Sequence, residues 1–178
     1  MLDRINRILT LLFATGAALS MAAVFLVILT NSLRRYFLGR SWPWGEELPV
    51  FLAIYGVMFG IALAYLQDRH IRFTILTDWL TERRRDVTYL VVDVSTVIMG
   101  AMLARSGLML IDSRGGREAS GIVTTARGLA RDLDMPWIAQ FGTLGPWQFA
   151  LVLGGALMVL AAGTRLALRV RALLDARG

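Results

Sequence analysis

Four long apolar runs dominate this sequence and leave few folds open to it. The runs cover about residues 8–30, 48–66, 87–110 and 147–168, and each carries few charged residues. A helix needs about 20 apolar residues to cross a bilayer core of about 30 Å. Hydrophobic residues make up 56% of the chain, which exceeds the share in ordinary soluble domains. We therefore expect a single all-α integral membrane domain, residues 1–178, with four transmembrane helices.

Arginines at the ends of the apolar runs indicate how the chain is oriented. Every basic residue is arginine, and the net charge is +6. A basic chain can bind nucleic acid, but arginines that flank membrane helices act as topology signals and contact lipid headgroups. More of them lie on the side that would hold both termini. The positive-inside rule therefore predicts cytoplasmic termini and contacts with membrane lipids, and we expect no nucleic-acid partner.

Two connections between the runs are expected to have features of their own. Residues 71–83 predict an amphipathic helix in the membrane interface, with a solvated linker as the alternative. The apolar face of this helix would carry Ile75, Leu76, Trp79 and Leu80. The long outer loop, residues 111–145, contains SRGGREASG at 113–121, whose composition predicts flexibility, and then has room for a short surface helix.

Two charged residues interrupt the third apolar run, Asp93 and Arg105. Twelve residues of helix turn through about 1200° and rise about 18 Å, so these two side chains cannot pair with each other. We expect Arg105 to reach for the outer interface. Asp93 is expected to face a neighbouring helix or a partner subunit, and an ion or proton relay is the alternative reading.

The stretch RSWPWGEELPVF, immediately before the second run, combines aromatic and acidic residues. Glu46 and Glu47 stand where a helix begins, and acids there complement the positive end of the helix dipole. Trp44 fits the aromatic belt of a membrane interface. We also expect both glutamates to join an ion-pair cluster at the outer interface. The arginines available for that cluster are Arg34, Arg35 and Arg105.

Small residues in the runs predict close helix packing, and the chain lacks the usual signatures of catalysis. Gly56 and Gly60 have the GxxxG spacing that lets helices approach. There is no cysteine, and His70 is the single histidine, so disulfides, Fe–S clusters and a haem held by two histidines are excluded. Nucleotide loops, HExxH pairs and nucleophile elbows are missing too. We expect no enzyme activity, no cofactor and no metal site.

A stretch of about 40 residues carries a more specific pattern, RRYFLGRSWPWGEELPVFLAIYGVMFGIALAYLQDRHIRFTIL. Its characteristic residues are Arg35, Tyr36, Gly39, Trp44, Glu46, Glu47, Leu48 and His70–Arg72. Together with MPWIAQFGTLGPWQF before the fourth run, this pattern resembles the small membrane subunit, DctQ-like, of tripartite ATP-independent periplasmic (TRAP) transporters. The resemblance covers the order of all four runs.

The resemblance implies a secondary transporter of three components in the bacterial inner membrane. A periplasmic substrate-binding protein captures an organic acid, and a large TRAP membrane subunit carries the substrate and sodium sites. The small subunit packs beside the large one as a scaffold and helps to dock the binding protein. Subunit-interface or structural roles then fall to Arg34, Arg35, Trp44, Glu46, Glu47, Gly56, Gly60, His70, Arg72, Asp93 and Arg105.

Two other functions stay open at the level of sequence. A self-assembling channel or small exporter would need a polar stripe, for which the third run offers Asp93, Ser95, Thr96 and Ser106. A membrane anchor of a redox enzyme would need haem or quinone ligands, and His70 alone is a poor set of them.

Overall fold

The computed structural model describes residues 2–67 and 82–175, and within them all regular structure is helical apart from one isolated bridge. Four helices are long and apolar enough to cross a membrane, which confirms the expected fold class. They are α1 (Leu2–Leu38), α2 (Glu47–Leu66), α4 (Glu82–Arg114) and α6 (Gly145–Asp175). The shorter elements are η1 (Pro43–Gly45), α5 (Val123–Asp132) and η2 (Pro136–Gly142).

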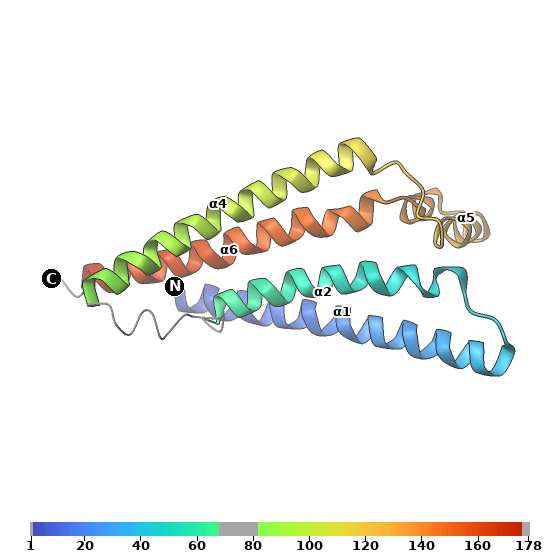
Figure 1. Cartoon of the computed structure of the whole chain (residues 1–178), viewed down its shortest axis with the longest axis horizontal. Helices are drawn as coiled ribbons and strands as arrows, with labels where there is room; N and C mark the ends of the chain where they lie inside the picture. Colours follow the sequence, from blue (N-terminus) through green and yellow to red (C-terminus); the bar gives the residue numbers. More distant parts are fainter. Residues whose placement is uncertain (1, 68–81, 176–178) are drawn as a thin grey trace.

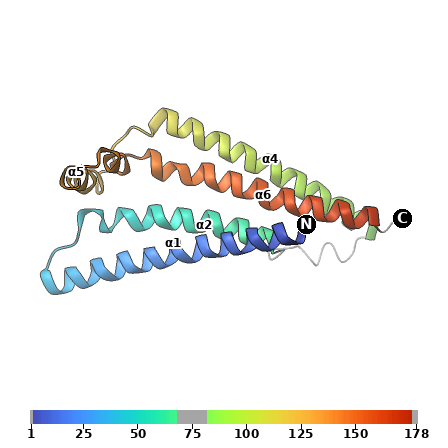
Figure 2. The same cartoon turned by 180° about the vertical axis from the view of Figure 1, so that it is seen from behind.

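The four long helices lie side by side in a row, in the order α1, α2, α6, α4 (Figures 1 and 2). Each of the pairs α1–α2 and α4–α6 forms an antiparallel hairpin, and contacts between α2 and α6 join the two hairpins. α1 and α4 are therefore the edges of the row. The start of α1 and the end of α6 lie at one end of the row, which we call the terminal end. At the opposite end, the α5 end, α5 runs crosswise to the long helices.

Small residues allow the helices of this row to approach closely. At the crossing of α4 and α6 one backbone approaches the other, because a Cβ atom on Gly155 would overlap the Ala104 backbone nitrogen and the Gly100 carbonyl oxygen. A Cβ atom on Gly16 of α1 would lie 2.7 Å from the ring of Phe59 on α2. These glycines have helical backbones, so packing rather than conformational freedom is the reason for glycine here.

Two apolar clusters stabilise the row, one near each end. The cluster nearer the terminal end contains the buried residues Phe13, Ala62, Leu66, Leu157 and Ala161, which come from α1, α2 and α6. The cluster at the α5 end contains Ala119, Ile122 and Ala126, against which Trp44 and Trp147 pack. The second cluster fixes the crosswise segment to the beginnings of α2 and α6.

The turn between α1 and α2 is defined by three residues. α1 ends at Leu38. The next residue, Gly39, has a positive φ of 67°, which suits glycine, and its N–H donates to the Arg35 carbonyl at 3.1 Å. Asn31, back on α1, accepts the Trp42 N–H at 2.8 Å and packs directly against Gly45. The turn thereby places Glu46 and Glu47 at the start of α2.

The expected interfacial helix, residues 71–83, lies almost wholly outside the described residues. α4 already begins at Glu82, five residues before the expected start of the third run. The remainder of the amphipathic segment, which includes Arg72 and follows His70, stays a prediction.

Candidate functional site

A buried ion pair joins three helices near the terminal end. The Asp93 carboxylate on α4 is 1% exposed. Its Oδ2 atom lies 3.2 Å from Nε of Arg169 on α6, and its Oδ1 atom accepts a hydrogen bond of 2.5 Å from the Tyr65 hydroxyl on α2. The Arg169 guanidinium also lies 4.5 Å from the ring centre of Tyr89, which adds a cation–π contact. The carboxylate is thus held by a cation and a hydroxyl from two neighbouring helices.

This arrangement leaves Asp93 little freedom for relay chemistry. Removing a charge from water is costly unless an opposite charge and hydrogen bonds compensate for it, and Asp93 has both. Among the hydroxyls of the proposed stripe on α4, that of Thr96 is satisfied within the helix, because it donates to the Val92 carbonyl at 2.8 Å. A channel lined by Asp93 would need this carboxylate to face an aqueous path, and it faces α2 and α6 instead.

At the α5 end, Glu47 anchors the connection between α4 and α6. Its Oε2 atom accepts the backbone N–H of Gly121 at 2.7 Å. A Cβ atom on Gly121 would lie 2.7 Å from the Pro43 carbonyl oxygen and 2.8 Å from Glu47 Oε2, so only glycine fits beside this carboxylate. The first turn of α2 is thereby bonded to the segment that leads into α5.

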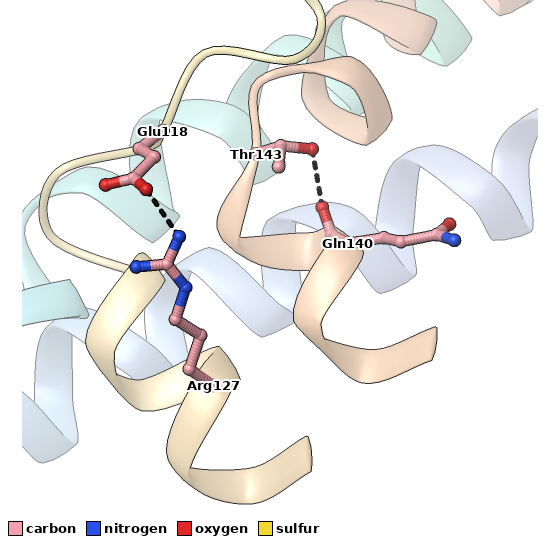
Figure 3. Close-up of polar contacts among 4 residues, drawn as sticks. All are labelled: Glu118, Arg127, Gln140 and Thr143. Atoms are coloured by element: carbon pink, nitrogen blue, oxygen red, sulfur yellow. Dashed lines mark hydrogen bonds and ion pairs between the residues drawn. The ribbon is translucent and has the colours of Figure 1, made fainter. Parts of the chain in front are cut away.

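Backbone hydrogen bonds fold the rest of this connection. The Ala119 N–H donates to the Gly142 carbonyl and the Leu144 N–H to the Arg117 carbonyl, both at 2.8 Å. Thr143 donates to the Gln140 carbonyl at 2.7 Å, and an exposed ion pair joins Glu118 to Arg127 (Figure 3). The composition of SRGGREASG predicted flexibility, and the structure differs because these bonds connect it to residues more than 20 positions away. The expected short surface helix corresponds to α5.

Aromatic rings cover the same end of the row and border an apolar groove. Trp147 stacks on Phe51 with ring centres 5.1 Å apart, and its Nε1 atom donates to the Phe141 carbonyl at 3.0 Å. The groove has a volume of about 340 Å³. Its lining is Trp44, Leu48, Ile122, Thr125, Ala126, Leu129, Ile138, Phe141 and Trp147. Trp44, a predicted belt residue, therefore contributes one wall of this groove.

The expected ion-pair cluster at this end is not formed among the described residues. The Arg34 guanidinium instead lies 4.7 Å from the ring centre of Trp42, which stacks on Trp44. Arg35 and Glu46 line a second groove of about 360 Å³ between α1 and α2, without an ion pair. Glu47 is directed to the Gly121 N–H. The expectation is wrong because side chains at the same depth in the membrane need not point toward one another.

The remaining sequence candidates lie apart from these contacts. Gly56 packs closely on α1, since a Cβ atom there would lie 3.1 Å from Met21 Sδ. Gly60 has open space around its Cα, so the GxxxG spacing is used at one glycine and not at the other. Arg105 lies on α4 with an exposed side chain and no ion pair or hydrogen bond to the described residues.

Comparison with known families decides what kind of protein contains these features. A family model described as "Tripartite ATP-independent periplasmic transporters, DctQ component" matches residues 24–172. The chain belongs to the DctQ family. The match takes in residues 24–38 of α1 and all of α2, α4 and α5, so both Glu47 and Asp93 lie within the DctQ region. No curated protein matches the chain.

Membership of the DctQ family makes the chain the small component of a tripartite transporter. It is a multi-pass membrane protein that takes part in transport, and the DctQ family is a family of transporter components. The sequence alone did not identify Tyr65 and Arg169 as the partners of Asp93. It also did not identify Gly121 as the partner of Glu47. A signal for Arg169 existed, because leucine and valine residues continue beyond 168, at Val170 and Leu173, and extend the helix past it.

Proposed function

We propose that this chain is the non-catalytic small permease subunit of a TRAP-type symporter, in which it scaffolds the large transport subunit. The observation that carries the proposal is the state of Asp93, the one acidic residue well inside an apolar run. It is paired with Arg169 and hydrogen-bonded to Tyr65. The charge of this chain is thus used to hold helices together, and ion coupling falls to the large subunit.

The row of helices supports a scaffolding role in a second way. α1 and α4 are edges, and most of their apolar side chains are exposed, for example Leu19 at 71% and Met99 at 68%. A compact, self-contained bundle would bury much more of this surface. Either edge alone would give the large subunit a long surface in the membrane to pack against.

We propose that the α5 end faces the periplasm and that both termini are cytoplasmic, in the bacterial inner membrane. The arginine distribution supports this orientation. The α5 end would then help to dock the periplasmic binding protein, with exposed Glu46 among the contact residues. The transported substrates would be organic acids, taken up with a sodium gradient. His70 and Arg72 remain subunit-interface candidates in this proposal.

Two experiments test the function together. Tagging the chain in its native cells, extracting it in mild detergent and identifying co-purified proteins should recover a large, many-span membrane partner in fixed ratio. Proteoliposomes with that partner and the binding protein should take up an organic acid when a sodium gradient is imposed. Omitting this chain should abolish uptake, and the chain alone should give no flux. Recovery of the chain as a homo-oligomer that conducts ions would establish the channel instead.

A further inference from the structure

Arg105 is a charged residue on the exposed surface of an edge helix. It lies two residues from Gly107, whose Cα side contacts Val152 of α6. Two residues turn an α-helix by about 200°, so Arg105 points away from α6, the neighbour of α4 in the row. Apolar side chains surround it on this outward face. The most exposed of them are Val91, Ile98, Met102 and Met109.

The depth of Arg105 can be measured against α6. Its neighbour Ala104 packs against Gly155, which lies eight residues after Trp147. Eight helical residues rise about 12 Å. Trp147 sits among the aromatic side chains that typically mark a membrane interface. Arg105 therefore lies well inside the apolar part of the row rather than at its rim.

The direction of α4 works against an escape of this charge to the nearer interface. Side chains in an α-helix lean toward its N-terminus. The N-terminus of α4 is at the terminal end, whereas the nearer end for Arg105 is the α5 end. To reach headgroups there, the side chain would have to extend against its own lean over about 12 Å. The direction of α4 therefore disfavours the expected reach of Arg105 to the outer interface, which stays a prediction.

Unlike Asp93, Arg105 has no partner of opposite charge among the described residues. Both residues are charged and both lie within the membrane-length part of α4. Asp93 faces the row and is paired with Arg169, whereas no described residue pairs with Arg105. Charged residues within membrane segments almost always pair with a partner or face water.

We propose that the outward face of α4, centred on Arg105, binds a membrane-spanning segment of the large subunit that supplies an Asp or Glu side chain to Arg105. This inference rests on the proposed function, because it assumes a membrane partner. The partner's carboxylate neutralises Arg105 within the membrane, and the apolar side chains around Arg105 pack against the same segment. The small side chain of Ala101, which is exposed on this face, allows close approach.

The test is co-purification of the large subunit with the tagged chain from native membranes, comparing wild type with variants. Arg105→Leu and Arg105→Glu should recover at least roughly tenfold less partner, since losing one member of a desolvated charge pair costs that much affinity. Arg105→Lys should retain most of it. All three should elute as folded protein with unchanged thermal stability, because the Arg105 side chain is exposed and makes no ion pair or hydrogen bond to the described residues.

Two tryptophan substitutions test the proposed face without changing any charge. Ala101→Trp adds bulk to the proposed face, and Ala22→Trp adds the same bulk to an exposed position on α1. Only Ala101→Trp should reduce recovery of the partner. Replacing acidic residues in the partner's spans by Arg, one at a time, should yield one change that restores binding to Arg105→Glu.

The possible outcomes distinguish a failure of this inference from a failure of the proposed function. If wild-type chain recovers no membrane partner, the proposed function fails. If wild type recovers the partner and Arg105→Leu recovers as much, the α4 inference alone is overturned. Native mass spectrometry tests whether Arg105 binds an anionic lipid instead of the partner. A variant that keeps the partner but loses a bound anionic phospholipid would assign Arg105 to a headgroup phosphate and overturn the proposal.

Discussion

The Asp93 carboxylate and the Arg169 guanidinium lie 3.2 Å apart across the α4–α6 interface, with the Asp93 side chain almost fully buried. Asp93→Ala should lower the free energy of unfolding by about 3 kcal/mol or more, because it leaves Arg169 without its carboxylate. Thermal unfolding in detergent, followed by circular dichroism, measures the loss. The double variant Asp93→Leu, Arg169→Leu removes both charges and should recover most of the stability. A single variant as stable as wild type would show that the pair has no structural role.

Two adjacent glutamates provide a matched comparison at the start of α2. Glu47 accepts the Gly121 N–H, whereas Glu46 is exposed and bonds to no described residue. Glu47→Ala should weaken the attachment of the α5 connection by about 2 kcal/mol, the value of a hydrogen bond to a charged acceptor. Amide exchange at Gly121 should then be roughly thirtyfold faster. Glu46→Ala should leave that exchange unchanged, and equal effects of the two would contradict the assignment.

The tight crossing of α4 and α6 depends on Gly155. Gly155→Ala should cost about 1–3 kcal/mol of unfolding free energy, because the added methyl group meets backbone atoms that cannot rotate away. Gly60→Ala is the control, since nothing surrounds Gly60. Alanine there should be neutral or slightly stabilising as the better helix former. Thermal midpoints of the two variants, measured side by side, give the answer, and a Gly60 variant as unstable as the Gly155 variant would refute this account.

The exposed ion pair in Figure 3 should contribute little. Glu118 and Arg127 keep 55% and 59% of their side-chain surface exposed. Glu118→Gln should change the unfolding free energy by less than about 0.5 kcal/mol, because water and salt screen such pairs. The backbone bonds of Ala119 and Leu144 carry the fold of this connection instead. Denaturation with and without 1 M salt tests this, and a strongly salt-dependent stability would contradict it.

The four spans could be predicted because hydropathy over 20 residues is a local property. The fold of the α5 end could not, since it depends on pairings such as Ala119 with Gly142 that no local window contains. SRGGREASG has the composition of a flexible loop, yet its last glycine, Gly121, is held by a glutamate of α2. Composition describes what a segment does alone, and here distant partners decide its structure.

The candidate site could also be predicted only in part from the sequence. The sequence indicates that Asp93 needs a partner, because an apolar run cannot solvate a carboxylate. It does not indicate which partner, since Arg169 is one of several arginines whose pattern is typical of the cytoplasmic end of a membrane helix. For Glu47 the difficulty is greater. Its partner is a backbone N–H, a group that every residue except proline carries, so side-chain identities give no signal for it.

The Asp93–Arg169 pair also sets a condition on how the chain is made. Arg169 follows Asp93 by 76 residues, and ribosomes add about 5–20 residues per second. α4 is therefore synthesised roughly 4 to 15 seconds before its counter-charge emerges. During that interval its helix either waits beside the insertion machinery or enters the bilayer with an unmatched carboxyl group. Release of α4 and α6 into the lipid as one hairpin resolves the difficulty, so the pair favours membrane insertion two helices at a time.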